Sequence, residues 1–554
     1  MARLDEDKMP MISPEDTVAN DDALSFGMKG RWCVNTAAQL TSVAILGSFQ
    51  LGFNLAALNT AKAFIALDFR WCLNERGLPH LDCATGRLYG SLVNAAAFVG
   101  ALVGCIVAGR VTELGRCACL RWAHCLCVVA CVLSAAALDF VTLFASRLFV
   151  GLALGLFTVC VPLYISEMSP ADSRGFYVTF HQLLIAFGPV VGTALGLAFS
   201  RAPGGSDAYS PTQFEKLWWR VMLGFPAVIS LLSALLLWFV YPFETPQILV
   251  ERDQKSQAGA LLREIYSRDT VGPELQSIIR RNHQKQSQDP SQLGMWRALV
   301  HPAYSKVIMF GCYLSIAQQL SGVNVLVADS NLLYSSLNLP PTLVTALTVA
   351  LMAIGFVVTI ATLPLVDHLG RRVLLLVSIA LCLASMCTAF VVSMINENSG
   401  ALRWIIVGCM YSFSVGFGLG YGPVFWIYLQ EIFPPEIKQA AVSLASSLNW
   451  LAAVAMVQAS DFLLQGGLTV LTGICTVSLG IVFVLTLFFA RETKGLPVGE
   501  SPYFTNPAIV HTPGDTLPTV GSLRERQEGA VDGIVAETAA DAAASDTKAS
   551  TGRP

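Results

Sequence analysis

Long apolar runs separated by short polar joints fill the chain from about residue 36 to residue 490. A helix needs about 20 mostly apolar residues to cross the hydrocarbon core of a bilayer, and twelve runs reach that length. The pattern therefore predicts twelve membrane-spanning helices. Their predicted bounds are 36–60, 86–109, 118–138, 140–166, 177–200, 219–241, 304–333, 341–366, 373–394, 402–430, 438–463 and 467–490.

Polar segments flank and divide these runs. The acidic start has no apolar stretch behind a basic segment, so we expect no cleavable signal peptide. Helical periodicity in the charged stretch after the sixth run predicts a soluble insert, and the Ala-, Asp-, Thr- and Gly-rich end predicts a mostly disordered tail. The predicted domains are a cytoplasmic N-terminal segment at 1–32, a six-helix half at 33–241, a cytoplasmic helical insert at 242–300, a second six-helix half at 301–491 and a cytoplasmic tail at 492–554.

Composition agrees with an all-α integral membrane protein. Of the 554 residues 54% are hydrophobic and 13% are charged, whereas roughly 25% are charged in an average soluble protein. So little charge argues against a soluble multidomain enzyme and against a disordered chain. The net charge of −3 argues against a nucleic-acid-binding protein, which would carry a basic stripe.

Short polar motifs recur in the same order in the two predicted halves. GRVTELGR follows the second span and DHLGRR follows the eighth. After the fourth and tenth spans an acid is followed seven residues later by a base, Glu167 by Arg174 and Glu431 by Lys438. ETP follows the sixth span and ETKG the twelfth. These matches indicate an internal duplication, which is typical of transporters built from two halves.

The distribution of positive charge predicts the sidedness. Lys and Arg are more frequent on the side with the recurring motifs, the N-terminus and the insert, which places both termini in the cytoplasm. Cys72 and Cys83 then bracket an outer polar loop, where an oxidising compartment would permit a disulfide. Most other cysteines lie in apolar runs. We expect no metal site, because four of them lack the paired C-x-x-C spacing of zinc sites: Cys117, Cys119, Cys125 and Cys127.

Further motifs resemble the sugar-porter family of the major facilitator superfamily: PLYISE at 162–167, QQLSG at 318–322 and GPVFW at 422–426. Others resemble the facilitative hexose transporters of apicomplexan, malaria-type parasites, among them LNT at 58–60, FRWC at 69–72 and KLWWR at 216–220. The resemblance runs from about Gly47 to Tyr503. It implies the major facilitator fold and uptake of glucose, with fructose as a further candidate, through the plasma membrane by a monomer surrounded by lipid.

The chain also departs from the family pattern. Cys117 stands in place of an Arg at the end of the first loop motif, and Thr112 stands where an Asp is common. Gln247 replaces the Arg of the motif after the sixth span. On the eighth helix Gly355 replaces an Asn that often touches sugar in this family. The last departure implies a slightly larger pocket and leaves the ranking of sugars open.

Neutral amides in the spans are candidate sugar ligands. A hexose presents hydroxyls, and side-chain amides both donate and accept hydrogen bonds without the free-energy cost of a charge at membrane depth. Gly322 permits a helix break that would turn separated amides toward one cavity. The alternative is that these amides only hold helices together. The candidates are Gln182, Gln318, Gln319, Asn324 and Asn449.

Trp426 is the aromatic candidate for the same site. It follows Gly422 and Pro423, where the helix loses a backbone donor and can unwind. An indole can stack on the apolar face of a sugar while its N–H reaches a hydroxyl. The alternative is a tryptophan that faces lipid or the membrane interface. The glycine-rich run before it lies in a span, so we interpret the run as a hinge and not as a phosphate loop.

Charged joints of both halves are expected to cluster at the cytoplasmic face. Ion pairs among them would hold the halves together while the cavity faces outward and would separate when it opens inward. Such a network could bias an equilibrium between two states, although single exposed pairs contribute little. The simpler alternative is that these charges only anchor the helices at the cytoplasmic face, as the positive-inside rule describes. The residues are Glu167, Arg174, Glu244, Arg371, Arg372, Glu431, Lys438 and Glu492.

Whether sugar transport is coupled to protons depends on a residue of the first helix. The resemblance implies that proton-driven members carry an Asp there, near an Arg on the fourth helix. Arg147 is present, but Asn54 occupies the acid position and an amide cannot carry a proton, so we predict passive uniport. Asp329 and Asp461 lie near outer helix ends, where they would serve an external gate, line a wet rim or, as a third alternative, couple protons.

Two other functions are also compatible with the sequence. The first is a proton-coupled hexose or polyol symporter. The second is a non-transporting sugar sensor, although the tail is short for a signalling segment. We expect no enzyme, because no nucleophile, metal or cofactor constellation occurs in the sequence, and for the same reason no cofactor is expected.

Overall fold

A computed structural model provides the structure of the protein. It describes residues 36–73, 79, 83–169, 174–199, 209–265, 268–287, 302–337, 339–395, 400–434, 437–465, 467–494 and 501–503. The chain is divided into two units, Met1–Tyr503 and Phe504–Pro554. All described residues belong to the first unit.

The described residues are almost entirely helical, and ten helices are long and apolar enough to cross a membrane. In the first half the helices are α3 (Thr36–Asp68), α4 (Ala84–Val111), α5 (Arg116–Ala135), α6 (Phe140–Met168), α7 (Arg174–Ala194) and α8 (Gln213–Leu235). In the second half they are α13 (Pro302–Leu320), α14 (Val323–Ser336), α15 (Pro341–Leu369), α16 (Arg371–Ile395), α17 (Gly400–Gly416), α18 (Pro423–Ile432), α19 (Lys438–Gln465) and α20 (Leu468–Phe489). Helix α3 and the pair α13–α14 occupy the first and seventh predicted positions.

Two predicted spans of the second half are interrupted. The span predicted at 304–333 is divided into α13 and α14 by Gly322, whose φ of +91° is a conformation that favours glycine. The expected break at this glycine is therefore confirmed. The span predicted at 402–430 consists of α17, a π-helical turn at Phe417–Tyr421 and α18, which starts at Pro423. The glycine-rich run thus lies where the regular helix is lost.

The charged stretch between the halves also forms helices. They are α9 (Pro246–Glu251), α10 (Lys255–Ile265) and α11 (Arg268–Ser287). Helix α10 contacts both α9 and α11. Its buried residues Ala258, Leu261 and Leu262 lie on one side, as expected for an amphipathic helix outside the bilayer.

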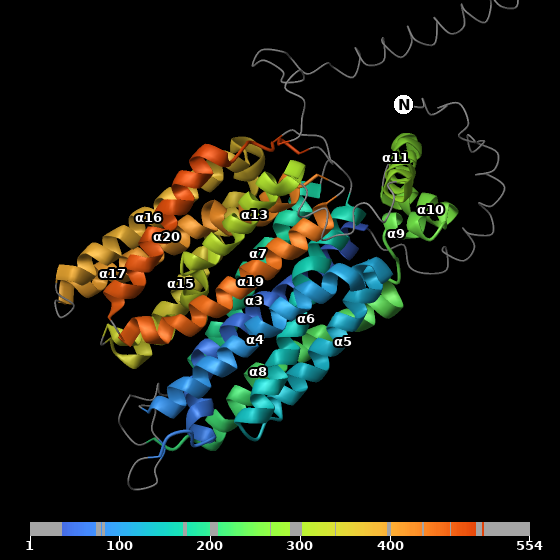
Figure 1. Ribbon diagram of the computed structural model, residues 1–554. Helices are drawn as coiled ribbons and strands as arrows, with labels where there is room; N and C mark the ends of the chain where they lie inside the picture. The colour runs from blue at the N-terminus through green and yellow to red at the C-terminus, as the bar shows by residue number, and fades with distance from the viewer. Residues whose placement is uncertain are drawn as a thin grey trace, which may run out of the picture. The chain divides into compact units, whose positions relative to one another are not determined.

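Close helix contacts position the cavity walls. Helix α3 packs along α7, where Gly52 faces the carbonyl of Ile185 and Gly188 faces the backbone N of Phe53, leaving no room for a Cβ. The two halves meet where α4 packs along α19, α7 along α15 and α3 along α14. Figure 1 shows the blue α4 beside the orange α19. Helices from both halves therefore surround the central space.

Candidate functional site: a cavity between the two halves

A cavity of about 170 Å³ lies between the halves. Its walls come from α3, α6 and α7 of the first half and from α13, α14, α15, α17, α18, α19 and the π-helical turn at Phe417–Tyr421 of the second half. None of the described lining residues is Asp, Glu, Lys or Arg. The lining includes all six residues that the sequence analysis assigned to substrate: Gln182, Gln318, Gln319, Asn324, Trp426 and Asn449.

Four of the amides form a hydrogen-bonded chain along the wall of the second half. Asn324 donates from Nδ2 to Oε1 of Gln319 at 2.6 Å. Gln319 donates from Nε2 to Oδ1 of Asn449 at 2.8 Å. Asn449 donates to Oε1 of Gln318 at 2.9 Å, and Gln318 donates to the carbonyl of Tyr421 at 2.9 Å. This row of hydrogen-bonded amides joins α13, α14 and α19 and reaches the π-helical turn after α17.

The hydrogen bonds among these amides leave some of their donor and acceptor groups available to a ligand. Asn449 uses both of its N–H groups, because it also donates to the carbonyl of Ser315 at 2.8 Å. Gln318 and Gln319 each donate one N–H, so each keeps a second donor. Asn324 keeps Oδ1 and one N–H. Both interpretations of the amides therefore apply: they hold helices together and they retain groups that can bind hydroxyls.

The opposite wall contributes Gln182 on α7. This side chain is buried, and its Oε1 has no hydrogen-bond partner among the described residues. A buried acceptor without a partner is unfavourable, so a ligand hydroxyl at this position would relieve that cost. Trp426 lines the cavity from α18 and contacts Phe425 at 5.0 Å between ring centroids. Its position in the cavity wall favours the sugar-facing assignment of Trp426 over the lipid-facing alternative.

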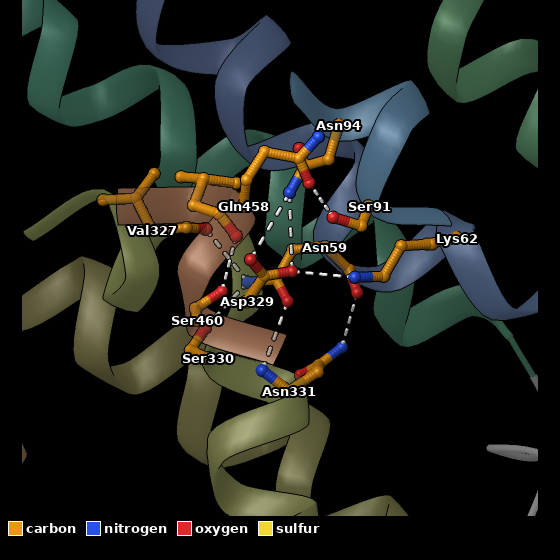
Figure 2. Close-up of polar contacts among 11 residues, drawn as sticks. Asn59, Lys62, Ser91, Asn94, Val327, Asp329, Ser330, Asn331, Gln458 and Ser460 are labelled. Atoms are coloured by element: carbon orange, nitrogen blue, oxygen red, sulfur yellow. Dashed lines mark hydrogen bonds and ion pairs between the residues drawn. The ribbon is translucent and has the colours of Figure 1, made fainter. Parts of the chain in front are cut away.

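Polar contacts bridge the halves at the end of the molecule that carries the Cys72–Cys83 disulfide, which we call the disulfide face. Lys62 on α3 pairs with Asp329 on α14 at 2.8 Å, and Asp329 is 3% exposed (Figure 2). Asn59 donates to Oγ of Ser330 at 2.7 Å and accepts from the backbone N of Asn331 at 3.2 Å. Helices α3 and α14 are therefore joined by charged and neutral hydrogen bonds.

A second helix of the first half extends these contacts. Asn94 on α4 lies 3.4 Å from both carboxylate oxygens of Asp329, and Ser91 hydrogen bonds to Gln458 of α19 (Figure 2). The burial of Asp329 contradicts a wet rim, one of the alternatives for this residue. The side chain of Asp461 lies outside the described residues.

The opposite end carries two arginine clusters, and we call it the arginine face. In the first half Arg116 donates to Oε1 of Glu167 at 3.1 Å, and the two side chains are 5% and 4% exposed. Glu244 accepts from the backbone N of Cys117 at 2.9 Å. Glu167 and Glu244 were predicted from the sequence, whereas Arg116 was not, although its motif position matches that of Arg371. The side chain of Arg174 lies outside the described residues.

The second half repeats this arrangement. Arg371 lies 3.3 Å from Glu431, and the side chains are 11% and 32% exposed. Glu492 accepts from the backbone N of Arg371 at 2.8 Å and of Arg372 at 3.1 Å. Lys438 is close enough to Glu431 to act on it electrostatically.

These ion pairs differ from the expected arrangement. Each of the two described at the arginine face joins residues of one half, whereas the sequence analysis expected pairs between the halves. The physical reason is local packing, because each arginine starts a helix that contacts the helix carrying its acid: α5 contacts α6, and α16 contacts α18. A hydrogen bond between the halves lies nearby, from Oγ of Ser443 to the carbonyl of Cys105 at 3.0 Å.

Asn54 and Arg147 lie together in the first half. Arg147 is 1% exposed and donates to the carbonyl of Asn54 at 2.8 Å. Asn54 donates from Nδ2 to the carbonyl of Gln50 at 2.9 Å. No carboxylate pairs with Arg147 in the part of the chain that the structure describes. The buried cation is therefore held by neutral groups.

Cys72 and Cys83 form a disulfide with a Cα–Cα distance of 5.9 Å. The contacts of Lys62, Asn59 and Asn94 were not predicted from the sequence, although Asn59 belongs to the LNT motif. The same holds for His181, which lines the cavity beside Gln182. Hydrophobic patterning carries little signal for these residues, because single polar residues in or beside an apolar run are equally compatible with structural roles.

The fold and the cavity define a class. The chain belongs to the sugar transporter family: the family model described as "Sugar (and other) transporter" matches residues 40–503. The solved structure of the proton:xylose symporter XylE bound to 6-bromo-6-deoxy-D-glucose superposes with a TM-score of 0.70 at 23% identity and covers 83% of this chain and 98% of that one. This likeness shows the major facilitator fold.

Particular relatives are more similar in sequence. Hexose transporter 1 of Toxoplasma gondii is 57% identical over 480 residues, which cover 87% of this chain and 84% of the relative. Hexose transporter 1 of Plasmodium falciparum is 36% identical over 493 residues, which cover 89% of this chain and 97% of the relative. The resemblance to apicomplexan hexose transporters noted in the sequence is confirmed.

Proposed function

We propose that this protein carries hexoses, glucose first among them, across a membrane by passive uniport with alternating access. The observation that carries the proposal is the cavity between the halves, which is lined by amides and by no Asp, Glu, Lys or Arg among the described residues. Neutral donors and acceptors match a neutral sugar, whereas an ionic substrate would require a counter-charge. The names of the relatives support the same substrate class.

Within the cavity we assign roles from hydrogen-bonding capacity. Gln182 would accept a sugar hydroxyl at Oε1, which has no other partner among the described residues. Gln318, Gln319 and Asn324 would donate the N–H groups that their chain leaves available. Asn449 would orient the two glutamines, because both of its N–H groups are used. Trp426 would stack on the apolar face of the sugar.

Alternating access would use the contacts at the two faces. The bonds of Asn59 and Lys62 to α14 close the disulfide face, and Gly322 permits α14 to move away from α3. The arginine clusters hold together the helix ends of each half, so that each half moves as a unit. Asp329 therefore acts as a gate residue, and Arg371, Arg372 and Glu492 stabilise the second half.

Sidedness follows from charge and redox chemistry. We assign the arginine face and both termini to the cytoplasm, because Lys and Arg favour that side. The disulfide face is assigned to the outside, where disulfides persist. An outer disulfide face supports a plasma-membrane location, and we further propose that the protein works as a monomer that contacts lipid directly.

Uniport is favoured over symport by the surroundings of Arg147. A proton carrier needs a group that titrates, and Asn54 offers only an amide and a carbonyl. The test is counterflow of D-glucose in proteoliposomes at equal pH on both sides. We expect counterflow to persist with a protonophore, and L-glucose to be excluded. Accumulation driven by a pH gradient and abolished by the protonophore would instead establish symport, and glucose binding without counterflow would establish a sensor.

A further inference from the structure

One side of α3 runs from the cavity to the gate contacts. Ser48, Gly52, Leu55, Asn59 and Lys62 follow each other at spacings of four, three, four and three residues, which places them on one face of an α-helix. Gly52 and Leu55 line the cavity, and Asn59 and Lys62 bond to α14. We call this face the α3 stripe. Its remaining member, Ser48, contacts α7.

The contact of Ser48 is a buried histidine. Oγ of Ser48 lies 2.5 Å from Nδ1 of His181, and both side chains are buried. His181 lines the cavity next to Gln182, and among the described lining residues it alone has a side chain that ordinarily titrates near neutral pH. Its second ring nitrogen, Nε2, has no partner among the described residues. His181 therefore joins the stripe to the cavity.

The hydrogen bond fixes the proton on the ring. The structure gives the Ser48 hydroxyl no other acceptor among the described residues, and a buried donor without an acceptor is unfavourable. Ser48 therefore donates to Nδ1, so a neutral imidazole carries its proton on Nε2. Because His181 lines the cavity and Nδ1 is engaged by Ser48, this N–H is the donor that His181 can offer to a sugar hydroxyl oxygen.

We propose that His181 is a further sugar-binding residue, and that Ser48 both orients it and transmits sugar occupancy to the α3 stripe. The inference rests on the proposed function as a hexose carrier. It assigns a donor that complements the unpaired Oε1 of Gln182 on the same helix. It also gives a physical route from the bound sugar to the gate, because Ser48 and Asn59 lie on one rigid helix face.

Two substitutions of His181 test the roles of its two ring nitrogens separately. In His181→Asn the amide oxygen can take the place of Nδ1 and accept the Ser48 hydroxyl, so that bond can form while the Nε2 donor is lost. In His181→Gln the amide nitrogen replaces Nε2, so the donor remains while the bond to Ser48 is lost. Ser48→Ala removes the same bond from the other side. His124→Asn is the matched control, because this buried histidine packs on Phe157 and does not line the cavity.

The measurements are D-glucose affinity, from quenching of tryptophan fluorescence, and the maximal rate of counterflow, with thermal unfolding as a folding check. His181→Asn should weaken glucose affinity about tenfold, as for one lost hydrogen bond. His181→Gln and Ser48→Ala should keep affinity within about threefold and lower the maximal rate about fivefold or more. His124→Asn should keep the parent affinity.

Other results would overturn the inference. Parent-like affinity in His181→Asn would show that Nε2 does not contact sugar, and a parent-like rate in Ser48→Ala would remove the link to the gate. If all variants lose unfolding temperature but bind glucose normally, His181 has only a structural role. Failure of the unsubstituted protein to bind or exchange D-glucose would instead reject the proposed function, which keeps the two failures distinct.

Discussion

The two faces of the molecule use polar contacts in opposite ways. At the disulfide face the ion pair of Lys62 with Asp329 connects helices of different halves. At the arginine face Arg116 pairs with Glu167 and Arg371 with Glu431, each within its own half. Contacts between halves are broken when a cavity opens at that face, whereas contacts within a half can persist in every state. The first kind governs the conformational equilibrium, and the second governs the integrity of each half.

The duplication makes the comparison sharper. The hydroxyl of Tyr164 donates to the carbonyl of Phe243 at 3.2 Å, and that of Tyr428 donates to the carbonyl of Arg491 at 3.0 Å. The two arginine clusters therefore share their geometry and differ chiefly in exposure. Tyr503 adds a contact to the second cluster, at 3.2 Å from the hydroxyl of Tyr428. This residue belongs to the segment that the sequence assigned to the tail.

The largest expected effect is on stability at the arginine face. Arg116→Ala leaves Glu167 buried without its partner, and the loss of one member of a buried pair costs about 3 to 5 kcal/mol. The thermal unfolding temperature of the purified protein should fall, and glucose affinity of the folded fraction should stay near that of the parent. An unchanged unfolding temperature would contradict a role of this pair in holding the first half together.

Removing the gate acid should act on transport. Asp329→Ala removes charge-assisted contacts worth about 1.5 to 3 kcal/mol, so the equilibrium should shift toward the state open at the disulfide face and counterflow should slow about tenfold or more. A double-mutant cycle with Lys62→Ala provides the check. Strictly additive effects of the two substitutions would show that their side chains do not act together.

Arg371→Ala tests the second cluster and is expected to have a smaller effect than Arg116→Ala. Glu431 is 32% exposed, so solvent screens the charge that the substitution leaves behind. We expect a loss of about 1 to 2 kcal/mol, measured as a smaller fall in unfolding temperature under the same conditions. An equal fall for both variants would mean that exposure does not distinguish the two halves.

The smallest effect is expected from the neutral bond between halves near the arginine face. Ser443→Ala removes the bond to the carbonyl of Cys105, worth about 0.5 to 1.5 kcal/mol. The substitution favours opening at the arginine face, whereas Asp329→Ala favours opening at the disulfide face. Adding Ser443→Ala to Asp329→Ala should therefore partly restore the rate of counterflow. A double variant slower than Asp329→Ala alone would show that the two bonds do not oppose each other.

Much of the fold could be predicted from hydrophobic patterning, because lipid requires a length of about 20 apolar residues for every span. The duplication was visible in short motifs, and Gly322 marked the broken helix through its missing Cβ. Gln318, Gln319 and Trp426 belong to motifs of the resembled family, and all six candidate ligands line one cavity. The pairing of Arg116 with Glu167 was not visible, since spacing along the chain carries no information about which helices pack together.

The sequence by itself indicated that the chain spans a membrane, that it is built from two related halves, and that neutral amides are the hydrogen-bonding candidates for its substrate site. These properties can be recognised from the order of residue types along the chain, without knowing which helices pack together. Only the tertiary structure decided which groups meet. Asn59 and Asn331 are separated by 272 positions, and Ser48 and His181 by 133. Contacts at such separations depend on helix packing, so they exist only once the chain has folded.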